Sequence, residues 1–235
     1  MKHSIVLLFA VLVAASPALA QSTGSERTVE ESYLQQSLET MIIREQAYGE
    51  SKDSKLVALQ YIREAVEGGR TGPDIQAALE FLATESTYTI IRSGGYGRPT
   101  NNYPDVRREA AFLLGKFKTP EAKDTLLKVA LADTEPMVIA AAIRSLGEIG
   151  IIENDDVTQA ISFIVNRFDI LMPDNSLAFE AIIAFELLAE ANKGIADPAA
   201  IRAIMRIAEG NYIKPVQDRA KALLTKLRQY AAAGK

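Results

Sequence analysis

One spacing of apolar residues recurs four times in the second half of this chain and constrains its fold more than any other feature. In each copy an aliphatic residue is followed by alanine four residues later, and by further apolar or small residues at seven, eight and eleven. The copies start at Val106, Val138, Leu177 and Val216, which are 32, 39 and 39 residues apart. All five positions share one side of an α-helix. A helical unit that returns at this interval predicts a solenoid, in which neighbouring helix pairs cover each other's apolar faces.

The rest of the chain completes ten expected helices in five pairs. No run of alternating polar and apolar residues is long enough for a strand, so we predict an all-α fold, an α-solenoid with a right-handed superhelix, over 27–230. A loop is expected at 93–104, where three glycines and two prolines exclude regular structure. The expected helices cover about 28–48, 53–68, 75–92, 156–171, 176–192, 198–209 and 215–230, and three more begin near 105, 120 and 137.

The first twenty residues have the pattern of a secretory signal peptide. Lys2 precedes an apolar run from Ile5 to Ala15, and Ala18-Leu19-Ala20 is a small-x-small cleavage site. We therefore expect a mature chain that starts at Gln21, with a flexible stretch over 21–26 and a loose tail over 231–235. Export to the periplasm is the first expectation and secretion is the alternative. An uncleaved N-terminal anchor is the competing interpretation of the same segment.

Composition argues against most catalytic and metal chemistry. The chain has no cysteine, and its one histidine, His3, lies in the predicted signal peptide. Thiolate and imidazole are the usual zinc and copper ligands, and also the usual nucleophile and base of hydrolytic sites. We therefore predict no catalytic residues, no cofactor and no metal. With a net charge of −4 the chain is not a general nucleic-acid binder, and no transmembrane segment is expected in the mature chain.

The charges are unevenly distributed along the chain. Residues 148–196 carry nine acids against two bases, whereas residues 197–235 carry eight bases against three acids. Two solvated surfaces, the second of them a soluble end cap, account for this pattern. The alternative is a basic docking face for an acidic partner or an anionic membrane surface.

Two of the recurring helices carry a glycine nine residues after their first apolar position, and they show a family resemblance. Asp105–Gly115 and Val138–Gly147 are similar to the second helix of a HEAT repeat, and especially to the short bacterial type first noticed in phycobilisome lyases. The resemblance extends over about 53–230 and implies a scaffold of HEAT-like helix pairs. It does not imply bilin attachment here, since that reaction normally uses groups that the mature chain lacks. Gly115 and Gly147 also lower helix stability, which suggests that another backbone approaches them closely.

Two sets of residues are candidates for partner binding. The first set lies in the predicted loop and consists of residue types that are common in recognition surfaces. The alternative is that the loop is an insertion that binds no partner. The second set occupies one flank of the recurring helices, where it forms either an exposed ridge or contacts with the next helix pair. The first set is Tyr96, Arg98, Asn101 and Tyr103, and the second is Phe112, Arg144 and Ile183.

Three functions are compatible with these residues. The first is a non-enzymatic protein-binding scaffold or adaptor of the bacterial cell envelope, whose partner is another protein. The second is an accessory or chaperone-like component of an envelope enzyme or transport system, docking through the basic C-terminal end. The third is a hydrolase that uses carboxylates alone, for which Asp155-Asp156 and the Glu186/Glu190 pair are the candidates.

Overall fold

The computed structural model describes residues 28–87, 90–92, 97, 100–171 and 173–233, so the predicted signal peptide lies outside the described residues. Ten α-helices and one short 3-10 helix make up this part of the chain. The α-helices are α1 (Val29–Ala47), α2 (Lys52–Glu67), α3 (Pro73–Thr84), α4 (Pro104–Leu114), α5 (Pro120–Ala132), α6 (Pro136–Ile149), α7 (Asp156–Leu171), α8 (Asn175–Asn192), α9 (Pro198–Glu209) and α10 (Lys214–Ala233). Five of them have proline as their first residue, where the missing N–H would have no helical partner.

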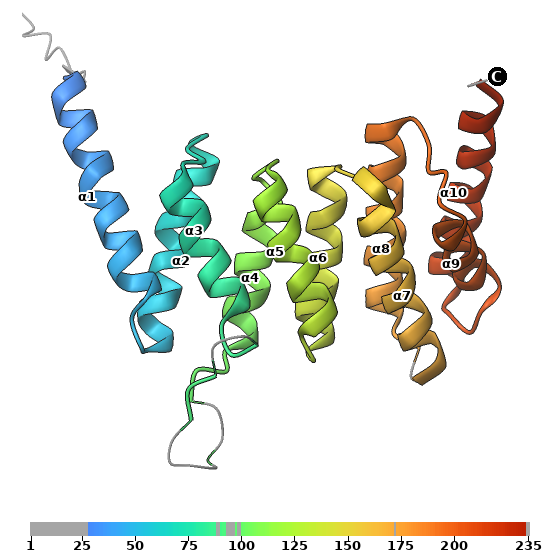
Figure 1. The fold of residues 1–235 in the computed structure, drawn as a ribbon, viewed down its shortest axis with the longest axis horizontal. Coiled ribbons are helices and arrows are strands. Elements are labelled where there is room, and N and C mark those ends of the chain that lie inside the picture. The colour runs from blue at the N-terminus through green and yellow to red at the C-terminus, as the bar shows by residue number, and fades with distance from the viewer. Residues whose placement is uncertain (1–27, 88–89, 93–96, 98–99, 172, 234–235) are drawn as a thin grey trace, which may run out of the picture.

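The helices form two layers that run side by side along the molecule. Each odd-numbered helix packs against the next odd-numbered one, each even-numbered helix against the next even-numbered one, and consecutive helices pair across the layers (Figure 1). The first residues of the four recurring copies, Val106, Val138, Leu177 and Val216, are all buried and lie on α4, α6, α8 and α10. The predicted α-solenoid is therefore confirmed.

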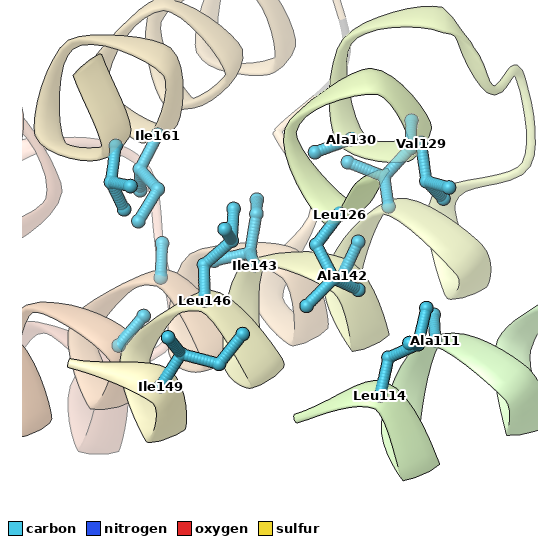
Figure 2. Close-up of a cluster of buried hydrophobic side chains, with 14 of the residues drawn as sticks. Ala111, Leu114, Leu126, Val129, Ala130, Ala142, Ile143, Leu146, Ile149 and Ile161 are labelled. Atoms are coloured by element: carbon cyan, nitrogen blue, oxygen red, sulfur yellow. The ribbon is translucent and has the colours of Figure 1, made fainter. Parts of the chain in front are cut away.

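The apolar core lies between the two layers. Figure 2 shows its central part, where Leu126 and Val129 of α5 and Ile161 of α7 face Ile143 and Leu146 of α6. All five side chains are fully buried. The alternation of layers lets each helix bury one stripe against its pair and its flanks against the neighbouring pairs, which explains why α6 carries nine buried residues.

The close approach that the two glycines suggested is present. A Cβ on Gly147 would lie 2.6 Å from the Cα of Ala184, so the backbones of α6 and α8 touch at this point. A Cβ on Gly115 would lie 2.8 Å from the Cβ of Ser145 in α6. The third copy has Glu186 at the equivalent position, and its carboxylate instead accepts a 2.7 Å hydrogen bond from Arg219 of α10.

We expect Gly147→Ala to lower the free energy of unfolding by about 1–3 kcal/mol, because the added methyl group forces two helix backbones apart. The gain of about 0.5–1 kcal/mol in helix propensity offsets only part of this loss. Urea unfolding followed by far-UV circular dichroism measures the difference. Gly72→Ala is the matched control, since nothing lies within 4 Å of its added Cβ. Equal stability of the two variants would contradict the close approach.

The third helix is shorter than the predicted span of 75–92. It ends at Thr84, whose hydroxyl donates a 2.7 Å hydrogen bond to the carbonyl of Glu80. Glu85 leaves the helix because its buried carboxylate pairs with Lys55 of α2, which is 1% exposed, at 3.0 Å. Ser86 follows with a φ of 64°, which no helix accepts. A tertiary ion pair therefore overrides the helical pattern that continues in the sequence.

The two ends of the connection from α3 to α4 are held to each other by hydrogen bonds. The side chain of Asn101 is buried, accepts a 3.1 Å hydrogen bond from the N–H of Ile91, and contacts Glu85. Thr100 donates its N–H to the carbonyl of Ile91 at 2.8 Å. The described parts of this connection project past the ends of the neighbouring helices (Figure 1).

Helix α1 forms within the predicted range of 28–48, but most of its apolar residues are exposed. Only Ile43 and Ala47 are buried. The core-facing side of α1 is set by α2 and α3, and these helices cover only its C-terminal half. At the other end of the chain, α10 continues to Ala233, three residues past its expected end.

Candidate protein-binding surface

A groove with a volume of about 440 Å³ crosses the layer of even-numbered helices. It is formed where α4, α6 and the start of α8 lie side by side. We refer to it as the even-helix groove. Its lining residues are Arg108, Glu109, Phe112, Met137, Ala140, Ala141, Arg144, Ser176 and Glu180.

The floor of the groove is made by small residues and its walls by large apolar ones. Ala140 and Ala141 lie on α6 and have no atoms beyond Cβ, so a bound side chain can approach the helix backbone there. Phe112 of α4 and Met137 of α6 are 41% and 45% exposed and flank this floor. An apolar floor between two exposed large side chains is suited to receive an aliphatic or aromatic side chain of another protein.

Ion pairs hold the rim of the groove in place. Arg144 donates to Glu148 and to Glu180, each at 3.2 Å, and so links α6 to α8. Lys116 donates to Glu148 at 2.7 Å and lies 5.0 Å from the centroid of the Phe112 ring. Phe112 keeps 41% of its surface exposed beside this cation–π contact, so part of its ring is available to a partner. The rim therefore combines both signs of charge around an apolar centre.

The groove continues towards α2 through residues that it shares with a neighbouring hollow. Arg108 and Glu109 line both, and Glu109 accepts a 2.6 Å hydrogen bond from Arg63 of α2. Burial raises the pKa of Asp105 in this hollow, but the hydrogen bond and charge of Lys52 at 2.7 Å, together with backbone hydrogen bonds, bring it below its usual value. Among the described residues, no ion-pair partner is found for Arg108, so its guanidinium is available to a partner's carboxylate.

The structure separates the residues that the sequence had grouped. Phe112 and Arg144 lie together in the even-helix groove. Ile183 is only 9% exposed and is not part of the lining. Asn101 is 4% exposed and Tyr103 is half-buried against the core, so both contribute to structure more than to an accessible surface.

Two further candidates, Tyr96 and Arg98, lie outside the described residues. The groove also contains residues that the sequence analysis did not single out, among them Met137, Ala141 and Glu180. The run Ala140-Ala141-Ala142 was a possible signal for a groove, since three small residues on one helix leave room on at least one face.

Part of the charge imbalance of the last two repeats is neutralised by ion pairs within the stack. Arg219 and Lys226 of α10 pair with Glu186 and Glu190 of α8, at 2.7 and 2.5 Å. Each of the two glutamates that sequence analysis considered as a catalytic pair is thus engaged by its own base. The hydrogen bond and charge of Glu186 raise the pKa of Arg219.

The other charged groups of the later repeats are only partly paired. Arg206 pairs with Asp169, and burial together with a hydrogen bond to this carboxylate raises the pKa of Tyr212. Asp156 accepts a 2.6 Å hydrogen bond from Lys123. Within the described part of the chain, four exposed bases of the last two helices have no ion-pair partner, namely Arg202, Lys214, Lys221 and Arg228.

The described residues contain no cluster of three or more side chains of the types that hold metal ions. None of the described helices combines the length and the apolar character that crossing a membrane requires.

Comparison with known proteins gives one match. Residues 100–169, which include α4, α5, α6 and most of α7, match a family model described as HEAT repeats. No curated protein and no solved structure matches the chain. The matched segment contains Phe112, Met137, Ala141 and Arg144 of the even-helix groove. Together with the ten stacked helices, the match supports a HEAT-repeat protein.

Proposed function

We propose that this chain of HEAT-like helix pairs is a non-enzymatic scaffold that binds a segment of another protein in the even-helix groove. HEAT repeats commonly mediate contacts between proteins. The observation that carries the proposal is the groove itself, which combines an alanine floor, two exposed large apolar side chains and a rim of ordered ion pairs. A solenoid whose helices are held by packing and ion pairs presents such a surface without rearrangement.

The lining residues indicate the chemistry of the segment. An aliphatic or aromatic anchor fits between Phe112 and Met137 above Ala141, because all three present apolar atoms to the groove. Acidic groups beside the anchor would face Arg108, and basic groups would face Glu180. We therefore propose an apolar anchor flanked by charges of both signs, in an extended or helical segment.

Export to the bacterial envelope, with the periplasm as the destination, is part of the same proposal. It is supported by the charge, apolar run and Ala18-Leu19-Ala20 motif at the start of the chain. Mass spectrometry of the protein recovered from a cell fractionation tests it. A periplasmic protein that begins at Gln21 is the expected result, and a cytoplasmic protein that retains residues 1–20 would contradict it.

Filling the groove should abolish binding without unfolding the protein. Ala141→Trp places a large ring on the floor, and we expect the affinity for the partner to fall at least about tenfold, since the anchor loses its place. The measurement is retention of envelope proteins on the immobilised variants, followed by titration of the retained protein. Ala222→Trp on the exposed face of α10 is the matched control, and it should bind as the unmodified protein does.

The comparison has a clear negative outcome. If a protein is retained equally by the unmodified chain and both tryptophan variants, binding does not use the groove. If no protein is retained by any of them, the scaffold proposal itself fails. Far-UV circular dichroism of the two variants checks that both remain folded.

A second candidate function is favoured by the four exposed bases of α9 and α10 that have no ion-pair partner in the described structure. An accessory protein could dock an acidic partner through this end, in place of the groove. Binding of that kind falls steeply as salt is raised, because the distance over which exposed charges attract each other shrinks from about 8–10 Å near physiological ionic strength to about 3 Å at 1 M. Retention that survives high salt but is lost in Ala141→Trp favours the groove, and the opposite pattern favours the basic end.

A further inference from the structure

The outer face of α1 carries an uncovered row of apolar side chains. Leu34, Leu38 and Met41 are 61%, 60% and 64% exposed, and Ile42 beside them is also exposed. We refer to these four residues as the α1 stripe. Tyr33 extends the exposed apolar surface towards the start of the helix. In the described part of the chain nothing covers this face.

The position of the stripe in the stack explains why it is uncovered. Every later odd-numbered helix packs against the odd-numbered helix before it, but α1 is the first and has no such neighbour (Figure 1). The opposite end of the stack is capped differently, because Arg202, Met205 and Glu209 on the exposed face of α9 make that surface mostly polar. Terminal repeats normally carry a polar outer face. The N-terminal end therefore has the surface of an internal repeat.

We propose that the α1 stripe is the interface of a two-fold symmetric dimer, in which α1 of one copy packs antiparallel against α1 of a second copy. Leu34, Leu38 and Met41 are spaced by four and three residues, the spacing of the seam between two paired helices. A two-fold symmetric contact uses the same face on both copies, so one interface covers the α1 stripe of each copy. This inference is independent of the even-helix groove.

The charges of α1 select the antiparallel arrangement. Glu30 lies in the first turn and Arg44 in the last, 14 residues later, which puts both on the same flank of the stripe. In an antiparallel pair with Leu34 of one copy opposite Leu38 of the other, each Glu30 meets the Arg44 of the second copy. Both side chains are exposed, and neither has an ion-pair partner among the residues that the structure describes. In a parallel pair this flank of one helix lies on the opposite side from the same flank of the other, so Glu30 and Arg44 of the two copies would not meet.

Sedimentation equilibrium of the purified protein over a range of concentrations tests the dimer. We expect a monomer–dimer equilibrium with a dissociation constant on the order of 10 µM, as befits a modest interface. Leu38→Glu should raise this constant at least about 100-fold, since two carboxylates would be buried at the two-fold axis. Leu38 is exposed in the monomer, so the fold of the variant should be unchanged.

Ile213→Glu is the matched control, because Ile213 is an exposed aliphatic residue at the opposite end of the stack. It should leave the dissociation constant unchanged. A protein that remains monomeric throughout, or a dimer that Leu38→Glu leaves intact, overturns the proposal. Weakening by both variants, with species larger than a dimer, would indicate head-to-tail stacking of copies and would overturn it too.

Charge reversal tests the orientation. Glu30→Arg and Arg44→Glu should each raise the dissociation constant by about fivefold, because each removes both symmetric pairs and creates like-charge contacts. The two substitutions together should restore it to within about twofold of the unmodified protein. If the double variant is as weak as the sum of the two single variants, the helices do not pair antiparallel in this register.

Discussion

Replacing Leu146 with aspartate should leave the protein insoluble or unfolded. Leu146 is fully buried on α6, in the centre of the stack, among the side chains of α5 and α7 (Figure 2). The substitution removes about 1.5–3 kcal/mol of transfer free energy and adds the cost of a buried carboxylate without a partner. The total exceeds about 4 kcal/mol, a large part of the 5–15 kcal/mol by which ordinary domains are stable.

Soluble yield and far-UV circular dichroism measure this effect. Leu131→Asp is the matched control, since Leu131 is an exposed leucine on α5. Its free energy of unfolding should stay within about 0.5 kcal/mol of the unmodified protein. A soluble Leu146→Asp variant that melts like the unmodified protein would contradict the assigned packing of α6.

Asp133→Ala should lower the free energy of unfolding by about 3–5 kcal/mol, because it leaves the guanidinium of Arg107 buried without its counter-ion. Both side chains are almost completely buried, and Arg107 Nε donates to Asp133 at 2.7 Å. Arg107 also donates to Asn102 at 2.8 Å, and Asp133 accepts the N–H of Glu135 at 2.9 Å. The pair therefore ties α4 to the turn before α6.

Chemical denaturation of the single and double variants measures this cost. Arg107→Met combined with Asp133→Leu should recover most of the loss, since an apolar pair has no charge to desolvate. Glu190→Ala is a control of the opposite kind. It removes the exposed pair with Lys226 and should change the free energy of unfolding by at most about 1 kcal/mol. If Asp133→Ala and Glu190→Ala lower the free energy of unfolding by equal amounts, burial does not determine how much these ion pairs contribute to stability.

The recurring apolar spacing was enough to predict the helical stack, because a helix must bury its stripe and the stripe repeats. Val106, Val138, Leu177 and Val216 are buried as the spacing required. The close approach at Gly147 was also predictable, since a glycine inside a helix lowers stability unless another backbone needs the space. Both inferences rest on features that lie within a single helix.

Predictions that depended on partners far away in the sequence were wrong or only partly correct. The helical pattern after Thr84 is interrupted by the buried pair of Glu85 with Lys55, thirty residues earlier in the chain. The binding surface was predicted in part, through Phe112 and Arg144, but their companions Met137 and Glu180 come from other turns and another helix. No local pattern shows which side chains of separate helices will share one groove.

By itself, the amino-acid sequence determined that this chain is a stack of helix pairs and which face of most helices is buried, because the periodicity of apolar residues is a local property. Only the tertiary structure decided which apolar residues stay exposed. Both α1 and α6 carry large apolar residues, yet α6 has a neighbour before and after it in its layer, α4 and α8, whereas α1 has only α3 after it. Burial depends on what lies across from a helix, and that is a property of the whole stack.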